Sequence, residues 1–500
     1  MTSTRSQELE DLYDAKIDAH FAEIRLLRSQ RNADCSKTKN LPPEILSTIF
    51  GMLHRDIAQH SYQKWIGVTH VCRTWRNTAL DDPSLWSNIT VVPSKWIPEA
   101  FARSKAAPLD LRQGGYYDAG DKLDFIFDHV AEHPERIKRL HFHGEPAAFI
   151  NSLTKPAPFL EHVSTTGDVD FPPDFLGGIA PRLKSVSCGG SLPLEATWLA
   201  NLTRLECQRV HLGAAYLSNL ISLELRYNWD ALDAAGGVVP HINIDLLLSA
   251  LQNMPLLQRL SLSLPTNFSD APSNRSTPIH LHHLRDICVS LPRPKMAFIF
   301  NHLRVDSIER LETSWPLYFK DTDMIEPVCR FFNECYHGSN LSYLLQESHA
   351  LEMHRFVGST PAHTPVLLFR SFRPTDLAIV VNMLPLCVPR IFATDKELPF
   401  KSPFPLADCD TIEELHVISK YSTSTVLEFS DEPSIPYPSL RQLHLERVSF
   451  VPKAKRIPPL KRWISKRKSG TKIELLVLKN CGLSDKDIAS LQKVVTVVGS

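Results

Sequence analysis

Two stretches of the sequence concentrate side chains that can bind a metal ion. The first reads His280-Leu-His-His283, and the second runs from Cys329 to His337 with two cysteines and one histidine. Structural zinc sites need two pairs of ligands at short, regular spacings. Neither stretch has a second pair at such a spacing, so we predict no metal ligand. We expect the histidines on the polar side of a strand or helix, and Cys329 and Cys335 on an amphipathic helix among core phenylalanines.

Motifs for nucleotide binding and covalent catalysis are absent. The sequence contains no GxxxxGK[ST], GxGxxG, HExxH or GxSxG. Glycine is scarce (19) and proline abundant (37). The chain therefore has many prolines that interrupt helices and strands, but few glycines from which a phosphate-binding loop could be built. We therefore predict no catalytic residue, no cofactor and no enzymatic activity.

Composition narrows the choice of partner. The 500 residues carry 55 Lys+Arg and 55 Asp+Glu, and 43% are hydrophobic, which is enough for one large core or several ordinary ones. A neutral chain argues against a dedicated nucleic-acid or membrane-surface protein. The ten cysteines are scattered, and no apolar run approaches the ~18 residues of a membrane span. We expect a protein of the cytoplasm, the nucleus or both, with no nucleic acid or membrane as partner.

The first element to position is a helix between Gln7 and Arg31. Its apolar or semi-apolar residues step by three and four, which is typical of one helical stripe. These residues are Leu9, Leu12, Tyr13, Ile17, Phe21, Ile24 and Leu27. The stripe fits either a short coiled coil or a helix packed on the next domain.

Three short helices are predicted next. Pro42 and Pro43 suit a helix first turn, and the following apolar residues give this helix an unusually broad apolar face. A second helix spans about 68–79, and Pro83 with Leu85 and Trp86 marks the turn into a third. About 45 residues are too few to bury three such faces among themselves. We expect a partner to cover them, the alternative being the rest of this chain.

These residues carry a resemblance. Leu41-Pro-Pro-Glu-Ile-Leu, Val71-Cys-Arg-Thr-Trp-Arg and Leu85-Trp86 follow one another in the order and spacing of an F-box. The segment 41–88 thus resembles the motif that docks a substrate receptor onto the Skp-type adaptor of a cullin-RING ubiquitin ligase. The form Trp65-Ile-Gly-Val-Thr-His-Val-Cys resembles the large F-box family of mushroom-forming fungi. The sequence departs from the family between Leu53 and Val68, where a longer polar segment replaces a tight connection.

The resemblance implies an adaptor-binding surface on the first two helices. The residues that it assigns to this surface are Leu41, Pro42, Ile45, Leu46, Ile49, Phe50, Val71, Cys72 and Trp75.

Beyond residue 93 a unit recurs in which buried-type residues sit at i, i+3 and i+5. The eleven clear instances are 137-140-142, 160-163-165, 183-186-188, 202-205-207, 220-223-225, 257-260-262, 284-287-289, 308-311-313, 412-415-417, 440-443-445 and 473-476-478. Weaker matches at 341-344, 366-369 and 388-391 fill the gap. Starts lie roughly in the high teens to high twenties apart, which is the period of leucine-rich repeats. The alternative is a generic α/β domain in which frequent leucines produce the pattern.

The expected fold class is α/β, with three parts. Residues 1–36 form the N-terminal helix, residues 37–92 the F-box, and residues 93–500 an irregular leucine-rich-repeat solenoid of parallel strands with helices or loops on its convex side. Residues between the buried strand positions would face the concave side and contact a protein substrate. The candidates are His141, His143, Glu206, Glu224, Arg226, His416, His444 and Glu446.

A basic run between Lys453 and Lys472 stands out in a neutral chain. It fits a nuclear-import signal, a site for a phosphorylated or acidic segment, or the solvated helix of the last repeat, which we favour.

Together these features predict the substrate-recognition subunit of an SCF-type ligase. The F-box would bind the adaptor and, through it, the cullin-RING ligase, while the repeats bind an unknown protein substrate. The alternative is a scaffold that uses the F-box only to bind the adaptor, independently of ubiquitin transfer.

Overall fold

A computed structural model of the chain gives the fold. It describes residues 2–35, 41–57, 66–89, 96–112, 122–142, 147–167, 169–193, 196–210, 217–226, 244–263, 277–291, 293–314, 325–338, 341–346, 350–357, 360–361, 364–370, 377–385, 387–394, 409–418, 437–448, 450, 453–467 and 472–499. His143 and most of the polar segment after the first F-box helix lie outside these ranges.

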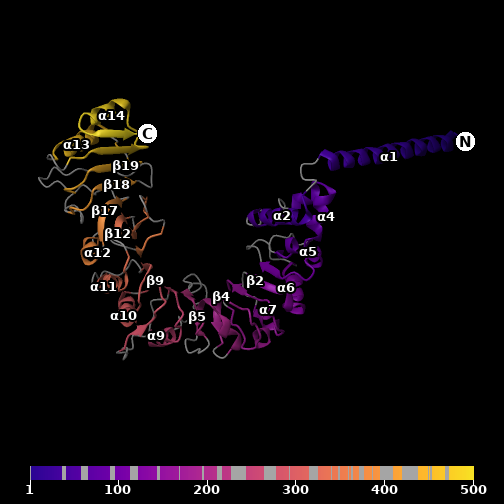
Figure 1. The fold of residues 1–500 in the computed structure, drawn as a ribbon, viewed down its shortest axis with the longest axis horizontal. Coiled ribbons are helices and arrows are strands. Elements are labelled where there is room, and N and C mark those ends of the chain that lie inside the picture. Colours follow the sequence, from indigo (N-terminus) through magenta and orange to yellow (C-terminus); the bar gives the residue numbers. More distant parts are fainter. Residues whose placement is uncertain are drawn as a thin grey trace. The chain divides into compact units, whose positions relative to one another are not determined.

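Helices and strands alternate along most of the described chain (Figure 1). The α-helices are α1 (Thr2–Cys35), α2 (Pro43–Ile57), α4 (Arg73–Asp81), α5 (Ile97–Arg103), α6 (Lys122–Glu132), α7 (Ala147–Ser152), α9 (Ile244–Gln252), α10 (Arg293–His302), α11 (Ile325–Cys335), α12 (Leu377–Met383), α13 (Lys453–Ser465) and α14 (Asp485–Gln492). The 3-10 helices are η1 (Ile66–His70), η2 (Pro83–Trp86), η5 (Pro134–Arg136), η6 (Phe175–Gly178) and η7 (Thr197–Asn201). None of the described helices has the length and apolar composition needed to cross a membrane.

Most strands are short. They are β1 (Leu109–Arg112), β2 (Ile137–Phe142), β3 (His162–Thr165), β4 (Ser185–Leu192), β5 (Arg204–Val210), β6 (Ser222–Arg226), β7 (Arg259–Ser263), β8 (Ile279–His280), β9 (Asp286–Ser290), β10 (Leu303–Arg304), β11 (Arg310–Ser314), β12 (Leu341–Gln346), β13 (Ala350–His354), β14 (Phe356–Val357), β15 (Thr360–Pro361), β16 (Leu367–Arg370), β17 (Cys387–Thr394), β18 (Glu414–Ile418), β19 (Gln442–Glu446), β20 (Leu475–Lys479) and β21 (Thr496–Gly499).

The chain divides into two compact units. Unit 1 is Met1–Gly167 with Asp174–Leu183, and unit 2 is Asp168–Pro173 with Lys184–Ser500. Within unit 1, the Asp110 N–H donates to the carbonyl of Ser87 at 2.9 Å, and Asn88 forms a parallel bridge to Asp110. The end of the F-box segment thereby joins β1.

Unit 1 combines the F-box helices with a small sheet. Strands β1, β2 and β3 are parallel neighbours, and Leu111, Leu140 and Val163 are buried on them. In α1, every side chain that the structure describes is exposed, including the apolar stripe from Leu9 to Leu27. Packing of α1 on the next domain, one of the two expectations, is therefore not seen. The coiled coil stays a prediction.

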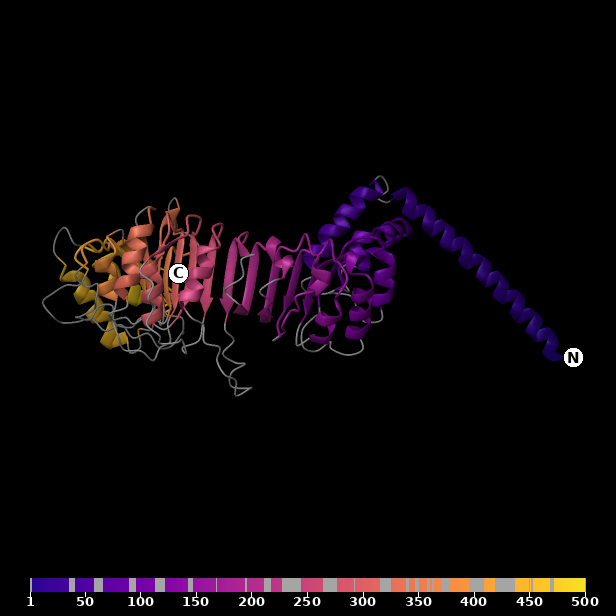
Figure 2. The same ribbon diagram turned by 90° about the horizontal axis from the view of Figure 1, so that it is seen from below.

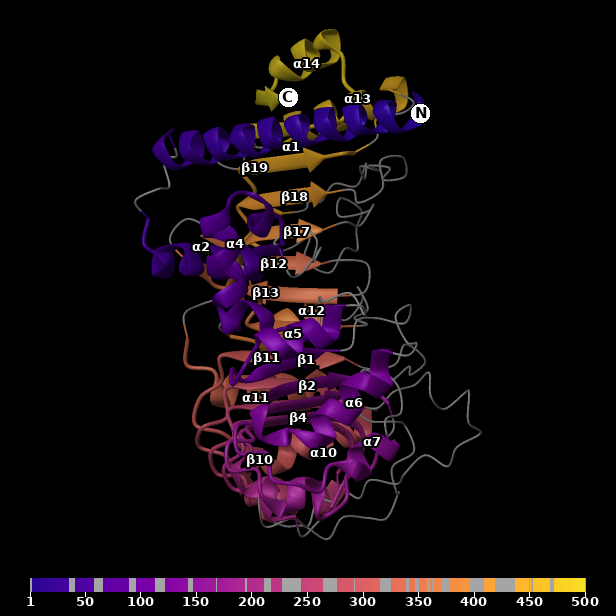
Figure 3. The ribbon, with the colours of Figure 1, turned by 90° about the vertical axis from the view of Figure 1, so that its right-hand side faces the viewer.

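Unit 2 contains a largely parallel sheet. Consecutive pairings run β4-β5-β6-β7-β9-β11-β16, then β13 and β12, then β17-β18-β19-β20-β21. Among the described strands of this sheet, only the pairs that include β13 are antiparallel, and β14 and β15 form a separate antiparallel pair. The magenta to pink strands that follow β4 lie side by side (Figure 2), and β13, β12, β17, β18 and β19 follow one another in that order in the sheet (Figure 3). Helices α9, α10, α11 and α12 lie along one side of the strands (Figure 1).

Each of the eleven predicted units forms a strand at the expected place. All three residues of every unit are buried. Parallel pairing in register stacks them: Leu223 lies beside Leu260, which lies beside Ile287. Because alternate side chains of a strand point to opposite faces, the intervening residues reach the other face of the sheet. The interior of unit 2 is thus a stack of aliphatic rows between strands and helices.

The region between 315 and 410 differs in detail from the prediction. Strands β12, β16 and β17 occupy the three weaker matches, and the antiparallel β13 was not predicted. The register of β17 was wrong, because Val388 is 38% exposed whereas Cys387 and Phe392 are buried. A bulge between β12 and β17 explains the shift, since two residues of β12 span four of β17.

Helix α11 confirms the amphipathic helix that the cysteines predicted. Cys329, Phe331, Phe332 and Cys335 are all buried. Burial raises the pKa of the Cys329 thiol to about 12, so this thiol is neutral and unreactive at neutral pH.

The basic run forms α13, in agreement with the favoured interpretation, but not all of it is solvated. Leu460, Trp463 and Ile464 pack into the core. Just beyond the helix, the Arg467 guanidinium is buried, lies over the Trp463 ring at 5.1 Å and donates to the carbonyl of Tyr437. Arg467 is therefore a structural residue and is not available to a partner.

Candidate functional site

The first candidate site lies on α2. The carbonyl of Pro42 accepts hydrogen bonds from the N–H groups of Ile45 (3.1 Å) and Leu46 (3.2 Å), which closes the first turn. Helix α2 then presents two different faces. Leu46 and Phe50 are buried, whereas a row at positions i, i+4 and i+7 is exposed. This row consists of Ile45 (47% exposed), Ile49 (42%) and Met52 (53%).

The buried face of α2 packs on α4 and η2. The rings of Phe50 and Trp75 lie 5.2 Å apart, and the buried Trp86 donates its indole N–H to the carbonyl of Ala79 at 2.9 Å. Arg76 links α4 to η1, since its Nε donates to the carbonyl of Thr69 at 2.8 Å. Three short helices thus share a small core and hold the exposed row in place.

The structure separates the nine predicted adaptor residues by burial. Leu46 and Phe50 lie inside the domain, so their side chains hold the helices together. Exposed members are Pro42, Ile45, Ile49 and Val71, and half-buried members are Leu41, Cys72 and Trp75. Met52 was missed by the sequence reasoning, although its position three residues after Ile49 on the same helical stripe was the signal.

The second candidate site lies on the polar face of β5 and β6. Arg226 forms ion pairs with Glu224 (Nε to Oε1, 2.6 Å) and with Glu206 (Nη1 to Oε1, 3.3 Å). The hydrogen bond with Glu224 raises the pKa of Arg226. On the next strand, the hydroxyl of Ser261 donates to Glu224 at 3.3 Å. Three of the predicted substrate-binding residues are thus in one cluster.

A shallow hollow of about 450 Å³ adjoins this cluster and extends to β11. Register sets Ser222, Arg259, Asp286 and Arg310 in one row across four strands, with Arg204 beside Ser222. The next row contains Glu224, Ser261, Cys288 and Glu312. The sequence reasoning missed Arg204, Arg259 and Arg310, although Arg204 lies two residues before Glu206, which it did place on this face. The surface alternates basic and acidic groups, so it suits a polar protein surface of mixed charge.

A third candidate site brings together His416, His444 and Glu446. Strands β18 and β19 are in register, so the two imidazole rings stack 4.1 Å apart, beside a hollow of about 260 Å³ that Lys479 also lines. Burial, with a smaller contribution from the charge of Lys479, lowers the pKa of both histidines to about 4. Both rings are therefore neutral at neutral pH.

His141 is on β2 of unit 1, half-buried, and His143 is outside the described residues.

The geometry thus defines an α/β protein with a three-helix N-terminal domain that exposes an apolar row. Residues 38–91 match the family described as F-box-like, so the chain contains an F-box-like domain. No curated protein matches the chain.

Proposed function

We propose that the protein is the substrate-recognition subunit of an SCF-type cullin-RING ubiquitin ligase. The F-box-like domain carries this proposal, because such domains typically bind Skp-type adaptors. The exposed row of Ile45, Ile49 and Met52 supplies the apolar surface that an adaptor would cover.

Unit 2 fits the role of substrate receptor as a leucine-rich-repeat solenoid. Support comes from its repeated strands with aliphatic residues in register and from helices along one side. Repeat arrays of this kind present extended surfaces for protein partners. The clusters around Arg226 and around His416 and His444 are the two places where we expect contact with the substrate.

In this proposal the protein itself makes and breaks no bond. It holds the adaptor at one site and a substrate at another, which raises the effective concentration of substrate lysines near the ubiquitin-charged enzyme. The chemical steps belong to other subunits.

The test is co-purification of the full-length protein with a Skp-type adaptor. We expect the double variant Ile45→Asp/Ile49→Asp to lose at least about tenfold in adaptor affinity, because it buries two unpaired charges in an apolar interface. Both side chains are exposed in the free protein, so the fold does not depend on them. Ile179→Asp, at another exposed isoleucine, is the matched control and should bind normally.

Undiminished adaptor binding by the double variant would show that this face of α2 is not the docking surface. Binding of the adaptor by the wild type without recruitment of a cullin would instead favour the ligase-independent scaffold.

A further inference from the structure

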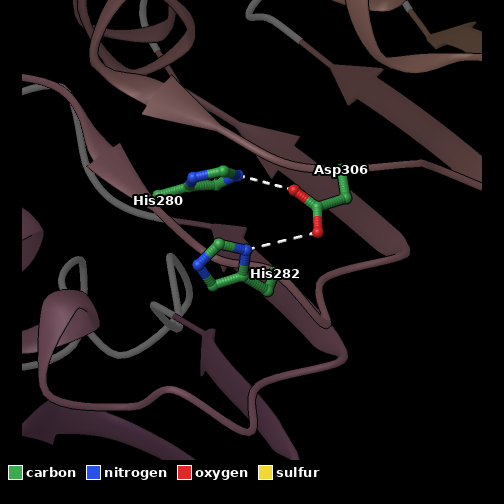
Figure 4. A group of neighbouring side chains, drawn as sticks. All are labelled: His280, His282 and Asp306. Atoms are coloured by element: carbon green, nitrogen blue, oxygen red, sulfur yellow. Dashed lines mark hydrogen bonds and ion pairs between the residues drawn. The ribbon is translucent and has the colours of Figure 1, made fainter.

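Two histidines and an aspartate meet on the surface of unit 2. His280 and His282 lie at and just after β8, and Asp306 lies two residues after β10 (Figure 4). His280 Nε2 is 2.7 Å from Asp306 Oδ1, and His282 Nδ1 is 3.2 Å from Asp306 Oδ2. One potential ligand atom from each residue lies within 4.8 Å of the others.

A short parallel ladder creates this arrangement. Leu303 pairs with Ile279 and Arg304 with His280, and the N–H of Leu281 donates to the carbonyl of Arg304 at 2.9 Å. Continuing the same register sets Asp306 opposite His282. Strand alternation sends all three side chains to one face of the ladder.

The other face of this ladder is packed into the core. The four alternating apolar residues of the two segments are buried: Ile279, Leu281, Leu303 and Val305. The side chains of the cluster are about half exposed, at 49% for His280, 60% for His282 and 55% for Asp306. The ligand atoms are thus held on a packed ladder but are open to solvent on the other side.

We propose that His280, His282 and Asp306 form a binding site for a zinc ion. Two imidazole nitrogens and one carboxylate oxygen are a common set of three zinc ligands, and water completes the tetrahedron. With Zn–N and Zn–O distances of about 2.0–2.1 Å, tetrahedral ligand atoms lie about 3.3 Å apart. In the structure one ligand atom from each of the three residues lies within 4.8 Å of the others, and each imidazole already contacts one oxygen of Asp306, at 2.7 and 3.2 Å. Rotation of the exposed side chains would bring both nitrogens and one carboxylate oxygen to this spacing. In the zinc-bound form each imidazole keeps its proton on the nitrogen that faces away from the metal.

Arg304 does not compete for the site. Arg304 lies on the same face of the ladder, but its guanidinium donates to the carbonyls of Asn301 and Leu303. The other group with suitable residues, Glu414, His416 and His444, has Lys479 close enough to lower the pKa of both histidines. A nearby ammonium group also opposes a divalent cation, so the group around Asp306 is the better site.

The site joins two segments that are far apart in sequence, so zinc should stabilise the native state. We expect zinc chloride to raise the thermal midpoint of the metal-free, full-length protein. In isothermal titration calorimetry, His282→Ala and Asp306→Asn should each weaken the tightest zinc site at least about tenfold. Circular dichroism of the metal-free variants should match the wild type, because the substituted side chains are exposed.

Two controls locate the site. His283→Ala removes an exposed imidazole of the same segment that is outside the cluster, and His416→Ala disrupts the other candidate group. Both should bind zinc like the wild type. Identical isotherms for the wild type, His282→Ala and Asp306→Asn would overturn the proposal, as would an equal loss of binding in either control.

Discussion

His416 and His444 illustrate how neighbouring strands change the chemistry of single residues. Each occupies an ordinary polar position of a strand, but in-register pairing stacks the rings at 4.1 Å beside Lys479. Burial and this lysine together disfavour the imidazolium form of both. At neutral pH the pair is therefore an uncharged aromatic surface, suited to hydrogen bonds and ring contacts with a protein partner.

This pair should make the protein sensitive to mild acid. The folded-state pKa values of about 4 lie below the ordinary value of 6.5, so the unfolded chain binds more protons between these limits. The free energy of unfolding is therefore highest above about pH 6.5. It falls as the pH drops towards 4, by on the order of 1 kcal/mol per histidine. Denaturant unfolding at about pH 7.5 and about pH 5 measures this difference in the free energy of unfolding.

The variant His416→Gln/His444→Gln should lose less stability between these two pH values than the wild type. His283→Gln, at an exposed histidine, should behave like the wild type. An equal loss in the wild type and the double variant would contradict the assignment.

Strand β4 shows why glycine is required at one point of an otherwise aliphatic sheet. Its pairing with β5 is interrupted by a bulge between Cys188 and Ser191. At Gly190 the backbone of Val169 approaches so closely that an added Cβ would overlap the carbonyl of Val169 and lie 2.7 Å from the Asp170 nitrogen. Backbone atoms cannot move aside as a flexible side chain can, so the contact depends on the missing side chain.

We therefore expect Gly190→Ala to lower the free energy of unfolding by at least about 2 kcal/mol. Gly51→Ala is the matched control: it lies inside α2 with nothing within 4 Å of an added Cβ, and it should raise stability by about 0.5–1 kcal/mol. Denaturant unfolding of both variants tests the pair. A tolerated Gly190→Ala would show that β4 and the segment at Val169 can separate.

At the scale of the whole molecule, the two proposed binding activities lie in different units. The exposed row of α2 belongs to unit 1, and the clusters around Arg226 and His416 belong to unit 2. Substitutions in one unit should then leave the other activity intact, because residues without shared contacts act independently.

Affinity purification with the proteasome inhibited tests this separation. Proteins retained by both the wild type and Ile45→Asp/Ile49→Asp are expected to be substrates, whereas proteins lost with the variant are ligase subunits. Substrates should in turn be lost with Glu224→Lys/Arg226→Glu, which retains the adaptor. Loss of adaptor and substrate together in either variant would contradict separate sites.

The local features of the molecule were predictable, because they depend on periodicity. The F-box helices follow from apolar residues at helical spacing around Leu46 and Trp75, and the eleven strands from aliphatic residues two and three apart. The prediction of register failed at Val388, because a bulge shifts the alternation of buried and exposed residues and no sequence pattern indicates that bulge. The prediction of solvent exposure from charge failed at Arg467. A basic residue in a basic run does not indicate that it will pack against a carbonyl and an indole ring.

By itself the sequence determined the buried positions of the eleven clear repeat strands and where most helices and strands lie, since spacing alone decides which residues share a face. Only the tertiary structure decided which residues meet. His280 and His282 gained a third partner because pairing of β8 with β10 brings Asp306 from more than twenty residues away. The apolar row of α2 became a separate surface because Leu46 and Phe50 turned inward onto α4. Such contacts depend on register and packing between distant segments, which local patterns do not encode.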